Sequence, residues 1–277
     1  MKASAGGYAR ASDVRQALEM LAASDGSGRV LAGGQSLIAA MNMRLSTGDI
    51  LIDISRIGEL AGVRETSDSL WIGALTPHAE IGRNALIRDH APLLSQAVTF
   101  IAHAAIRNRG TIGGALAHAD PAAEFPACVL ALGATLHVEG LNGRRDIPAE
   151  DFFHDLFETA IQDGEILTGL SIPKAGPDER QTITEVARRS GDYALAGVCL
   201  VQRSGKHRLS LFSVAPKPVL AVQAMAELDR GDIEGAVRAL QADIDPSSDT
   251  QATATYRRHL AGTLLRRAAA SIRGESE

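Results

Sequence analysis

The fold is decided by two short stretches, Ala32-Gly33-Gly34-Gln35-Ser36 and Thr111-Ile112-Gly113-Gly114-Ala115. Each pairs two glycines with a small hydroxyl residue that can add a hydrogen-bond donor. Glycine lets a backbone amide approach a ligand closely and permits a positive φ angle, and successive amides in such a turn form a concave site for an anion. Two loops of this kind that face each other would hold a pyrophosphate from both sides. Either pair alone is also a common signal for a tight turn without a ligand.

Other known phosphate, nucleophile and metal motifs are missing from the sequence. There is no Gly-x-Gly-x-x-Gly after a strand, no P-loop, no Gly-x-Ser-x-Gly, no Cys-x-x-Cys and no His-Glu-x-x-His. His118 and Asp120 could share a metal, but a polar loop position and a helix cap are favoured, so no metal ligand is predicted. Asp53, His78 and Glu80 could serve as acid or base, but capping and surface roles are favoured for each, and no catalytic residue is predicted.

Composition limits the class of protein further. The 277 residues suffice for two or three packed units, with 45% hydrophobic and 22% charged residues. No apolar run reaches about 18 residues, so no transmembrane segment is expected, and the first residues lack a secretory pattern. Cys128 and Cys199 show no pairing logic, which favours the reducing cytoplasm. A net charge of -5 and 4% aromatic residues argue against a nucleic-acid partner.

Hydrophobic periodicity predicts alternating strands and helices in the first two thirds of the chain. A helix capped by Ser12-Asp13 is expected first, and further helices are expected to begin at Thr76-Pro77, to run from His90 to His103, and to begin at Asp120-Pro121. The strands are expected at residues 29–32, 50–54, 69–73, 134–138 and 166–172.

The last third of the chain has a different pattern. Two prolines and a glycine between Pro173 and Pro177 indicate a boundary. Three strands are expected beyond it, at residues 182–186, 194–201 and 208–214, followed by helices at 233–240 and 250–273. Strands first and helices last favour an α+β unit.

Five stretches together resemble the FAD-binding medium subunit of molybdenum hydroxylases. The longest and most specific runs from Ile106 to Glu124 and contains the second glycine pair. The others are residues 31–37 with Met43-Arg44-Leu45, residues 72–81, residues 188–194 and residues 213–218. The resemblance covers nearly the whole chain and is similar in pattern to the flavoprotein subunits of carbon monoxide dehydrogenase and of bacterial N-heterocycle or aldehyde dehydrogenases.

The resemblance implies an α+β protein with an FAD-binding fold of the vanillyl-alcohol-oxidase (PCMH) type. Its two subdomains would span residues 1–56 and 57–174, and a C-terminal α+β domain of the CO dehydrogenase flavoprotein type would span residues 175–277. The glycine loops would contact the pyrophosphate, Glu124 would lie near the ribose or adenine, Leu167 would line the flavin pocket, and Tyr193 would lie against the isoalloxazine ring. The full set of implied FAD-binding residues is Ala32, Gly33, Gly34, Gln35, Ser36, Leu37, Thr76, Thr111, Ile112, Gly113, Gly114, Ala115, Glu124, Leu167 and Tyr193.

Three positions depart from the pattern of the family. Ala39 stands where proline is frequent, and Ala115 replaces a frequent serine, which removes a hydroxyl near the phosphates. Glu185 stands where relatives often have lysine, so a positive charge near the flavin is missing and the redox tuning of the cofactor is affected. The glycine pairs are intact, and FAD binding is still expected.

The resemblance implies an oxidoreductase subunit that carries FAD. It would take electrons from [2Fe-2S] clusters of a small partner subunit, while a large partner with the molybdenum cofactor oxidises the substrate, and it would pass them to an external acceptor. A dimer of heterotrimers in the cytoplasm is expected, with Arg107 and Arg109 as candidates for subunit or cofactor contacts or as solvated surface groups. A stand-alone flavin oxidase of the same fold and a cofactor-free assembly scaffold are the alternatives. No residue decides the substrate or the acceptor.

Overall fold

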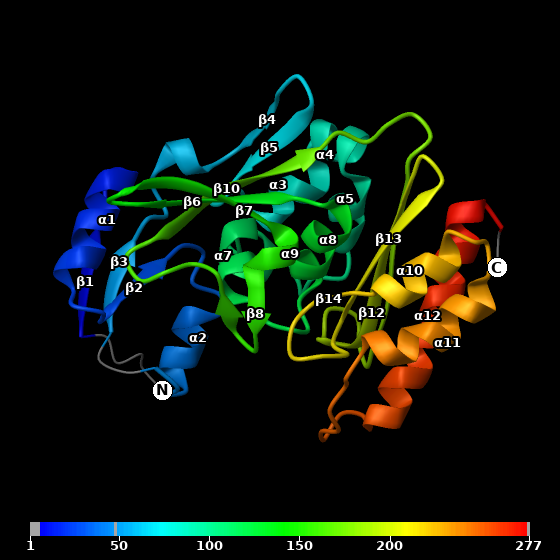
Figure 1. Cartoon of the computed structure of the whole chain (residues 1–277). Coiled ribbons are helices and arrows are strands. Elements are labelled where there is room, and N and C mark those ends of the chain that lie inside the picture. Colours follow the sequence, from blue (N-terminus) through cyan, green and yellow to red (C-terminus); the bar gives the residue numbers. More distant parts are fainter. Residues whose placement is uncertain (1–5, 47–48, 276–277) are drawn as a thin grey trace.

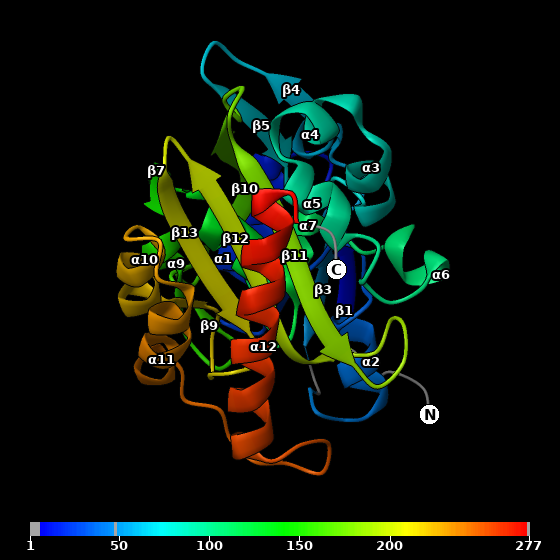
Figure 2. The same cartoon turned by 90° about the vertical axis from the view of Figure 1, so that its right-hand side faces the viewer.

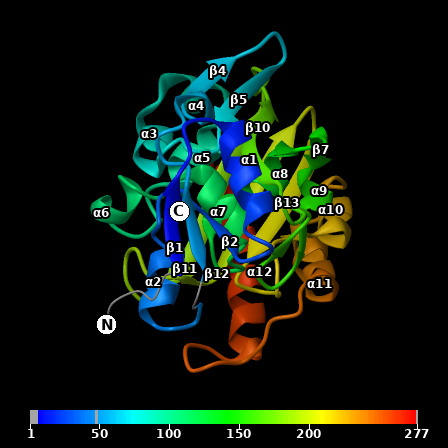
Figure 3. The same cartoon turned by 90° about the vertical axis from the view of Figure 1, so that its left-hand side faces the viewer.

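The computed structural model describes residues 6–46 and 49–275. Near the N-terminus, three parallel strands form a sheet in the order β1 (Gly7–Arg10), β3 (Ile50–Asp53) and β2 (Gly28–Leu31). Helix α1 (Val14–Ala23) covers this sheet (Figure 3). It begins as predicted, because the Asp13 side chain caps it by accepting from the Gln16 amide.

A five-stranded antiparallel sheet forms the middle of the protein. Its order is β4 (Val63–Glu65), β5 (Ser69–Gly73), β10 (Ile166–Pro173), β6 (Thr135–Gly140) and β7 (Gly143–Pro148). Between β5 and β6 the chain forms six helices, which lie on one side of the sheet (Figure 1). They are α3 (His78–Arg83), α4 (Ala85–His90), α5 (Pro92–Ala97), α6 (Ala104–Arg107), α7 (Ile112–His118) and α8 (Glu124–Leu132).

The C-terminal part is a second antiparallel sheet with helices on its outer face. The strands are β11 (Arg180–Ala187), β12 (Ala194–Arg203), β13 (Lys206–Phe212) and β14 (Val219–Leu220). The outer face carries α10 (Val222–Leu228), α11 (Ile233–Asp243) and α12 (Ala254–Arg273), and Figure 2 shows α12 lying across the strands. The inner face packs against α8 and α5. Short elements complete the chain: α2 (Leu37–Asn42), the 3-10 helix η1 (Gly58–Leu60), α9 (Ala149–Phe152), β8 (Phe153–Asp155) and β9 (Glu158–Thr159).

The largest hydrophobic core joins the middle sheet to the C-terminal sheet through α8. It contains Phe125 and Cys128 of α8, Leu170 of β10, Ile183 of β11 and Phe212 of β13, all buried. Every residue of α8 is buried, so this helix is the central element of the protein. Its apolar sequence on all sides is explained by this position between two sheets.

Two helix predictions are wrong in detail. The helix expected from His90 to His103 is shorter: His90 ends α4, Ala91 leaves the helical conformation (φ -144°, ψ 54°), and α5 runs only from Pro92 to Ala97. No helix begins at Asp120-Pro121 either. The Asp120 carboxylate accepts from the Ala122 amide in a turn, and α8 begins only at Glu124. None of the helices in the described residues is long and apolar enough to cross a membrane.

Candidate flavin-binding site

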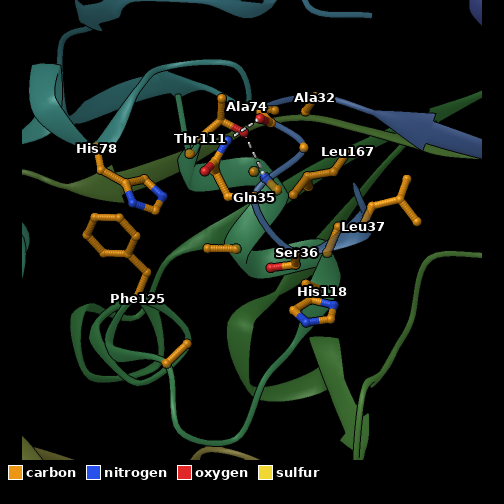
Figure 4. A pocket seen from close by; sticks show the side chains of 18 of the residues that line it. Ala32, Gln35, Ser36, Leu37, Ala74, His78, Thr111, His118, Phe125 and Leu167 are labelled. Carbon is orange, nitrogen blue, oxygen red and sulfur yellow. Dashed lines mark hydrogen bonds between the residues drawn. The ribbon is translucent and has the colours of Figure 1, made fainter. Parts of the chain in front are cut away.

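A cavity of about 660 Å³ lies between the N-terminal sheet, α7 and the start of the C-terminal unit. Its volume falls within the roughly 300–1,000 Å³ of ligand pockets. Both glycine loops line it, and Figure 4 shows Ala32, Thr111 and Ser36 from the two loops around one space. The predicted meeting of two segments that lie far apart in the sequence is therefore present in the structure.

The glycines bring the two loops into contact. A Cβ atom on Gly33 would overlap the backbone carbonyl of Arg109, and one on Gly113 would overlap Ala74. These two positions need glycine because of neighbouring backbone, a reason that the sequence alone did not reveal. Gly34 has a positive φ of 73°, as expected for a turn residue.

The backbone amides of the second loop are used inside the protein. Those of Ile112 and Gly113 donate to carbonyls of the segment before α3. The Thr111 side-chain oxygen accepts from the Gly114 amide at 3.1 Å and so caps α7. The Thr111 hydroxyl hydrogen remains available for a ligand. The second loop thus supplies a fixed wall and one hydroxyl rather than a row of amides.

The first loop is the source of free donors. Among the described residues, no group accepts a hydrogen bond from the four amides of Gly33–Ser36. The Gln35 side chain folds back and donates to the Gly33 carbonyl at 3.0 Å, which fixes the loop. The free backbone amides of the two glycine loops therefore lie on the first loop, whereas the second loop keeps one free hydroxyl hydrogen, that of Thr111.

His78 and Phe125 form the side of the cavity that faces away from Leu37 and Leu167 (Figure 4). Their rings meet edge to face, with centroids 5.0 Å apart. His78 is only 7% exposed, and neither ring nitrogen has a hydrogen-bond partner. Burial lowers the pKa of His78 to about 4, the Arg107 charge lowers it further, and the Thr111 carbonyl opposes the shift. The surface role favoured from the sequence is wrong, because α8 covers this side chain.

Glu124 is a buried carboxyl group in the wall of the cavity, with 8% exposure. Burial raises its pKa to about 8, and the charges of Glu185 and Asp120 act in the same direction. Burial also raises the pKa of Glu185 to about 7. Glu124 is therefore mainly protonated at neutral pH and can donate a hydrogen bond. The Tyr193 side chain is 69% exposed. Burial raises its pKa, and the nearby charges of Asp120 and Glu124 act in the same direction.

Most of the predicted residues line the cavity, and two do not. The residues that line it are Ala32, Gly33, Gly34, Gln35, Ser36, Leu37, Thr111, Gly113, Gly114, Ala115, Glu124, Leu167 and Tyr193. Thr76 lies behind the wall, where its hydroxyl bonds to the Gly62 backbone amide and carbonyl. Ile112 points into the hydrophobic core and is fully buried.

Several lining residues were missed from the sequence. Apart from His78 and Phe125, they include Ile101, Ala102 and His118. Single apolar or histidine residues carry no motif, and only the packing of distant elements brings them together. The Arg107 guanidinium, left open between contact and solvated roles, donates to the carbonyls of Ile101 and Ala102 at 2.8 and 2.9 Å and fixes this turn.

Two family models match the chain. The model described as "FAD binding domain in molybdopterin dehydrogenase" matches residues 2–175. The model described as "CO dehydrogenase flavoprotein C-terminal domain" matches residues 181–272. Together they define a flavoprotein subunit of a dehydrogenase. The chain belongs to the FAD-binding medium subunits of the molybdenum hydroxylases, a family of oxidoreductases.

Similar proteins of known name agree with this assignment. The chain is 35% identical to the 6-hydroxypseudooxynicotine dehydrogenase complex subunit alpha of Paenarthrobacter nicotinovorans, over 94% of this chain and 92% of that protein. It is 32% identical to the carbon monoxide dehydrogenase medium chain of Hydrogenophaga pseudoflava, over 94% of each.

A solved structure of carbon monoxide dehydrogenase from Hydrogenophaga pseudoflava, which lacks the Mo-pyranopterin moiety of the molybdenum cofactor, contains a similar chain. It matches with a TM-score of 0.95 and 31% identity, and all of both chains is covered. The predicted fold, with its FAD-binding part and its C-terminal CO dehydrogenase flavoprotein part, is confirmed, as is FAD as the cofactor of this family's domain.

Proposed function

We propose that this chain is the electron-transfer subunit of a molybdenum hydroxylase-type dehydrogenase. On its FAD it receives electrons from [2Fe-2S] clusters of a small partner subunit and delivers them to an external acceptor. A large partner with the molybdenum cofactor oxidises the substrate. The subunits form a dimer of heterotrimers in the cytoplasm, and the two buried free thiols agree with a reducing compartment.

The observation that carries this proposal is the cavity with four unpartnered amides on its first loop. Such a row of amides fits the pyrophosphate of FAD, because concave arrays of N–H groups bind anions. The positive φ of Gly34 turns this loop, and all four of its residues line the cavity. The Thr111 hydroxyl of the second loop adds a donor from the opposite side.

The residues of this chain bind and orient the cofactor. FAD, when bound, supplies the ability to accept and release electrons. Protonated Glu124 donates a hydrogen bond to a sugar hydroxyl, and Leu167 packs against the cofactor on the opposite side of the cavity from His78. Tyr193 covers the opening with an exposed ring, which keeps bulk water from the flavin while leaving a route for electrons. The division at residues 56 and 174 into two FAD-binding subdomains and a C-terminal domain belongs to the same proposal.

Partner subunits are inferred from the relatives. One is named a medium chain and another a subunit of a dehydrogenase complex. The match to these relatives extends over nearly the full length of both chains, so the surfaces that such complexes use have counterparts here. The identity of the substrate belongs to the large partner.

The test is the visible spectrum of the chain purified with its partner subunits, followed by anaerobic addition of the holoenzyme's substrate. We expect oxidised flavin bands, FAD released on denaturation, and bleaching of the flavin only when the partners are present. Bleaching of the isolated chain by a small substrate would favour the stand-alone oxidase. A colourless chain that takes up no added FAD would favour the scaffold.

A further inference from the structure

His78 is a polar side chain of the cavity that the protein leaves without a partner. It is 7% exposed, it lines the cavity, and in the described part of the chain neither ring nitrogen makes a hydrogen bond. Buried polar groups are nearly always hydrogen-bonded. The missing partner is therefore expected on the molecule that fills the cavity.

The position of His78 indicates which part of the cofactor it meets. Its ring stands edge-on to Phe125 and lies across the glycine loops from Leu37 and Leu167 (Figure 4). A Cβ atom on Gly110 would lie 3.1 Å from the His78 ring, so the ring is held against the turn that leads into the second loop. The imidazole therefore has a fixed place at one end of the cavity.

This end of the cavity also lies near Tyr193, a lining residue whose side chain is 69% exposed. Tyr193 interacts with Glu124, which directly precedes Phe125. The neighbouring Gly191 lies against the Ala102 backbone. A redox-active ring has to exchange electrons with groups outside the chain, and Tyr193 is the residue expected against the isoalloxazine ring, so this ring is expected beside His78.

The protonation state of His78 decides which role it can take. Burial keeps the imidazole neutral, with a pKa of about 4, so one nitrogen carries a hydrogen and the other is an acceptor. The Thr111 backbone favours the protonated ring and so partly opposes this shift in the pKa of His78. The remaining nitrogen needs a donor, and oxidised isoalloxazine has a single ring N–H, at N3.

We propose that the unprotonated ring nitrogen of His78 accepts a hydrogen bond from the N3–H group of the isoalloxazine ring and so orients the flavin against Phe125. This inference rests on the proposed function, because it requires FAD in the cavity. His78 then acts as a positioning residue for the cofactor, at the opposite side of the glycine loops from Leu167.

The experiment compares His78→Phe, which keeps an aromatic ring beside Phe125, with His78→Gln, which keeps an acceptor. FAD affinity is measured by titrating apoprotein, and the N3–H band of the flavin is identified by resonance Raman spectroscopy in H₂O and D₂O. We expect His78→Phe to bind FAD about tenfold more weakly, the effect of one lost hydrogen bond, and to shift the N3–H band toward a non-bonded frequency. His78→Gln should restore part of both.

His90 provides the matched control, since it also has a buried ring nitrogen without a partner but lies outside the cavity, with its other nitrogen 3.6 Å from Glu65. His90→Gln should leave the affinity and the band unchanged. A wild-type chain that binds no FAD would overturn the proposed function. Wild-type affinity and an unchanged band in His78→Phe would overturn only the role of His78. Nitrogen-15 NMR of the wild-type protein needs no variant: the ring signal of His78 should change when FAD is added, and an unchanged signal would contradict the hydrogen bond.

Discussion

The buried carboxyl group of Glu124 shows how one residue can be adapted to the cavity at some expense to stability. The side chain is 8% exposed and faces the negative charges of Asp120 and Glu185. A charged form would be poorly solvated there, so the folded protein holds the proton more tightly than the unfolded chain does. The carboxyl is then a donor at neutral pH, which an ordinary surface glutamate is not.

Replacing Glu124 with glutamine should change how stability depends on pH. In the wild type the pKa of Glu124 rises from 4.5 to about 8 on folding. Between these values the folded state binds more protons than the unfolded state, so stability is fully present below the unfolded pKa and is lost as pH rises toward 8. The slope is up to about 1.4 kcal/mol per pH unit. Glu124→Gln should remove most of this slope in urea unfolding of the apoprotein.

The exposed Glu19, which pairs with Arg15 on the surface of α1, serves as the control. Glu19→Gln should leave the pH dependence of unfolding as it is in the wild type. If Glu124→Gln shifted the free energy of unfolding by the same amount at every pH, the raised pKa of Glu124 would be contradicted.

Individual site residues were predictable where they belong to a motif. The first glycine loop and the stretch around Thr111 have a recognisable local pattern, and their residues, except the core residue Ile112, line the cavity. His78 and Phe125 were not predictable, because their chemistry depends on burial by an element that lies far away in the sequence. The need for glycine at position 33 could not be predicted either, because it arises from the backbone carbonyl of Arg109, which a Cβ atom would overlap.

Among the secondary-structure elements, the contact between the two glycine loops can be tested with a single methyl group. Gly33→Ala would place a Cβ atom onto the Arg109 carbonyl, so the loops must separate. We expect a loss of about 1–3 kcal/mol in stability, typical of overpacking, and a strong loss of bound FAD. The measurements are the flavin-to-protein ratio and the denaturation midpoint.

Gly58→Ala is the matched substitution, because a Cβ atom there meets nothing within 4 Å and its φ is not positive. It should leave both the flavin content and the midpoint close to those of the wild type. Equal flavin content in Gly33→Ala and Gly58→Ala would show that the contact between the loops does not shape the site.

Strands and long helices followed their sequence patterns better than short elements did. The strand predicted at residues 69–73 is β5, and the predicted strand at 194–201 lies within β12, because β-branched and apolar residues dominate both. The single helix expected to begin at Thr76-Pro77 is two short helices, because Asn84 leaves the helical conformation after α3 and its side chain caps α4. The short β1 and β9 have too few residues for a pattern, and only their pairing defines them, β1 with the distant β3 and β9 with the neighbouring β8.

One hydrophobic core contains residues from both regions that the two family models match, and so holds the whole protein together. Phe125 and Cys128 belong to the first matched region, whereas Cys199 and Phe212 belong to the second, and all four share one buried cluster. The sulfur atoms of the two cysteines lie 3.7 Å apart as free thiols. Such a shared core couples the two regions in unfolding, so we infer that they do not unfold independently.

Arg208 provides the polar counterpart of this core. Its guanidinium donates to the carbonyls of Leu130 and Ala131 at 2.9 and 3.1 Å, and it forms an ion pair with Glu150. The C-terminal sheet thereby supplies donors to the last turn of α8, where the Leu130 carbonyl also accepts from the Gly133 amide at 3.3 Å. A change at this one side chain therefore acts on both regions at once.

Calorimetry of Arg208→Met tests this coupling. The Ala131 carbonyl would lose its Arg208 donor, and the Leu130 carbonyl would keep only the Gly133 amide. A cost of about 1–3 kcal/mol, at about 2–4 °C per kcal/mol, should move the transition down by several degrees. Because the core is shared, the wild type and the variant should each show a single transition, and added FAD should raise it in both. Arg266→Met removes an exposed ion pair with Glu234 and should change the transition little. Two transitions, with only the later region responding to Arg208→Met, would contradict the coupling through α8.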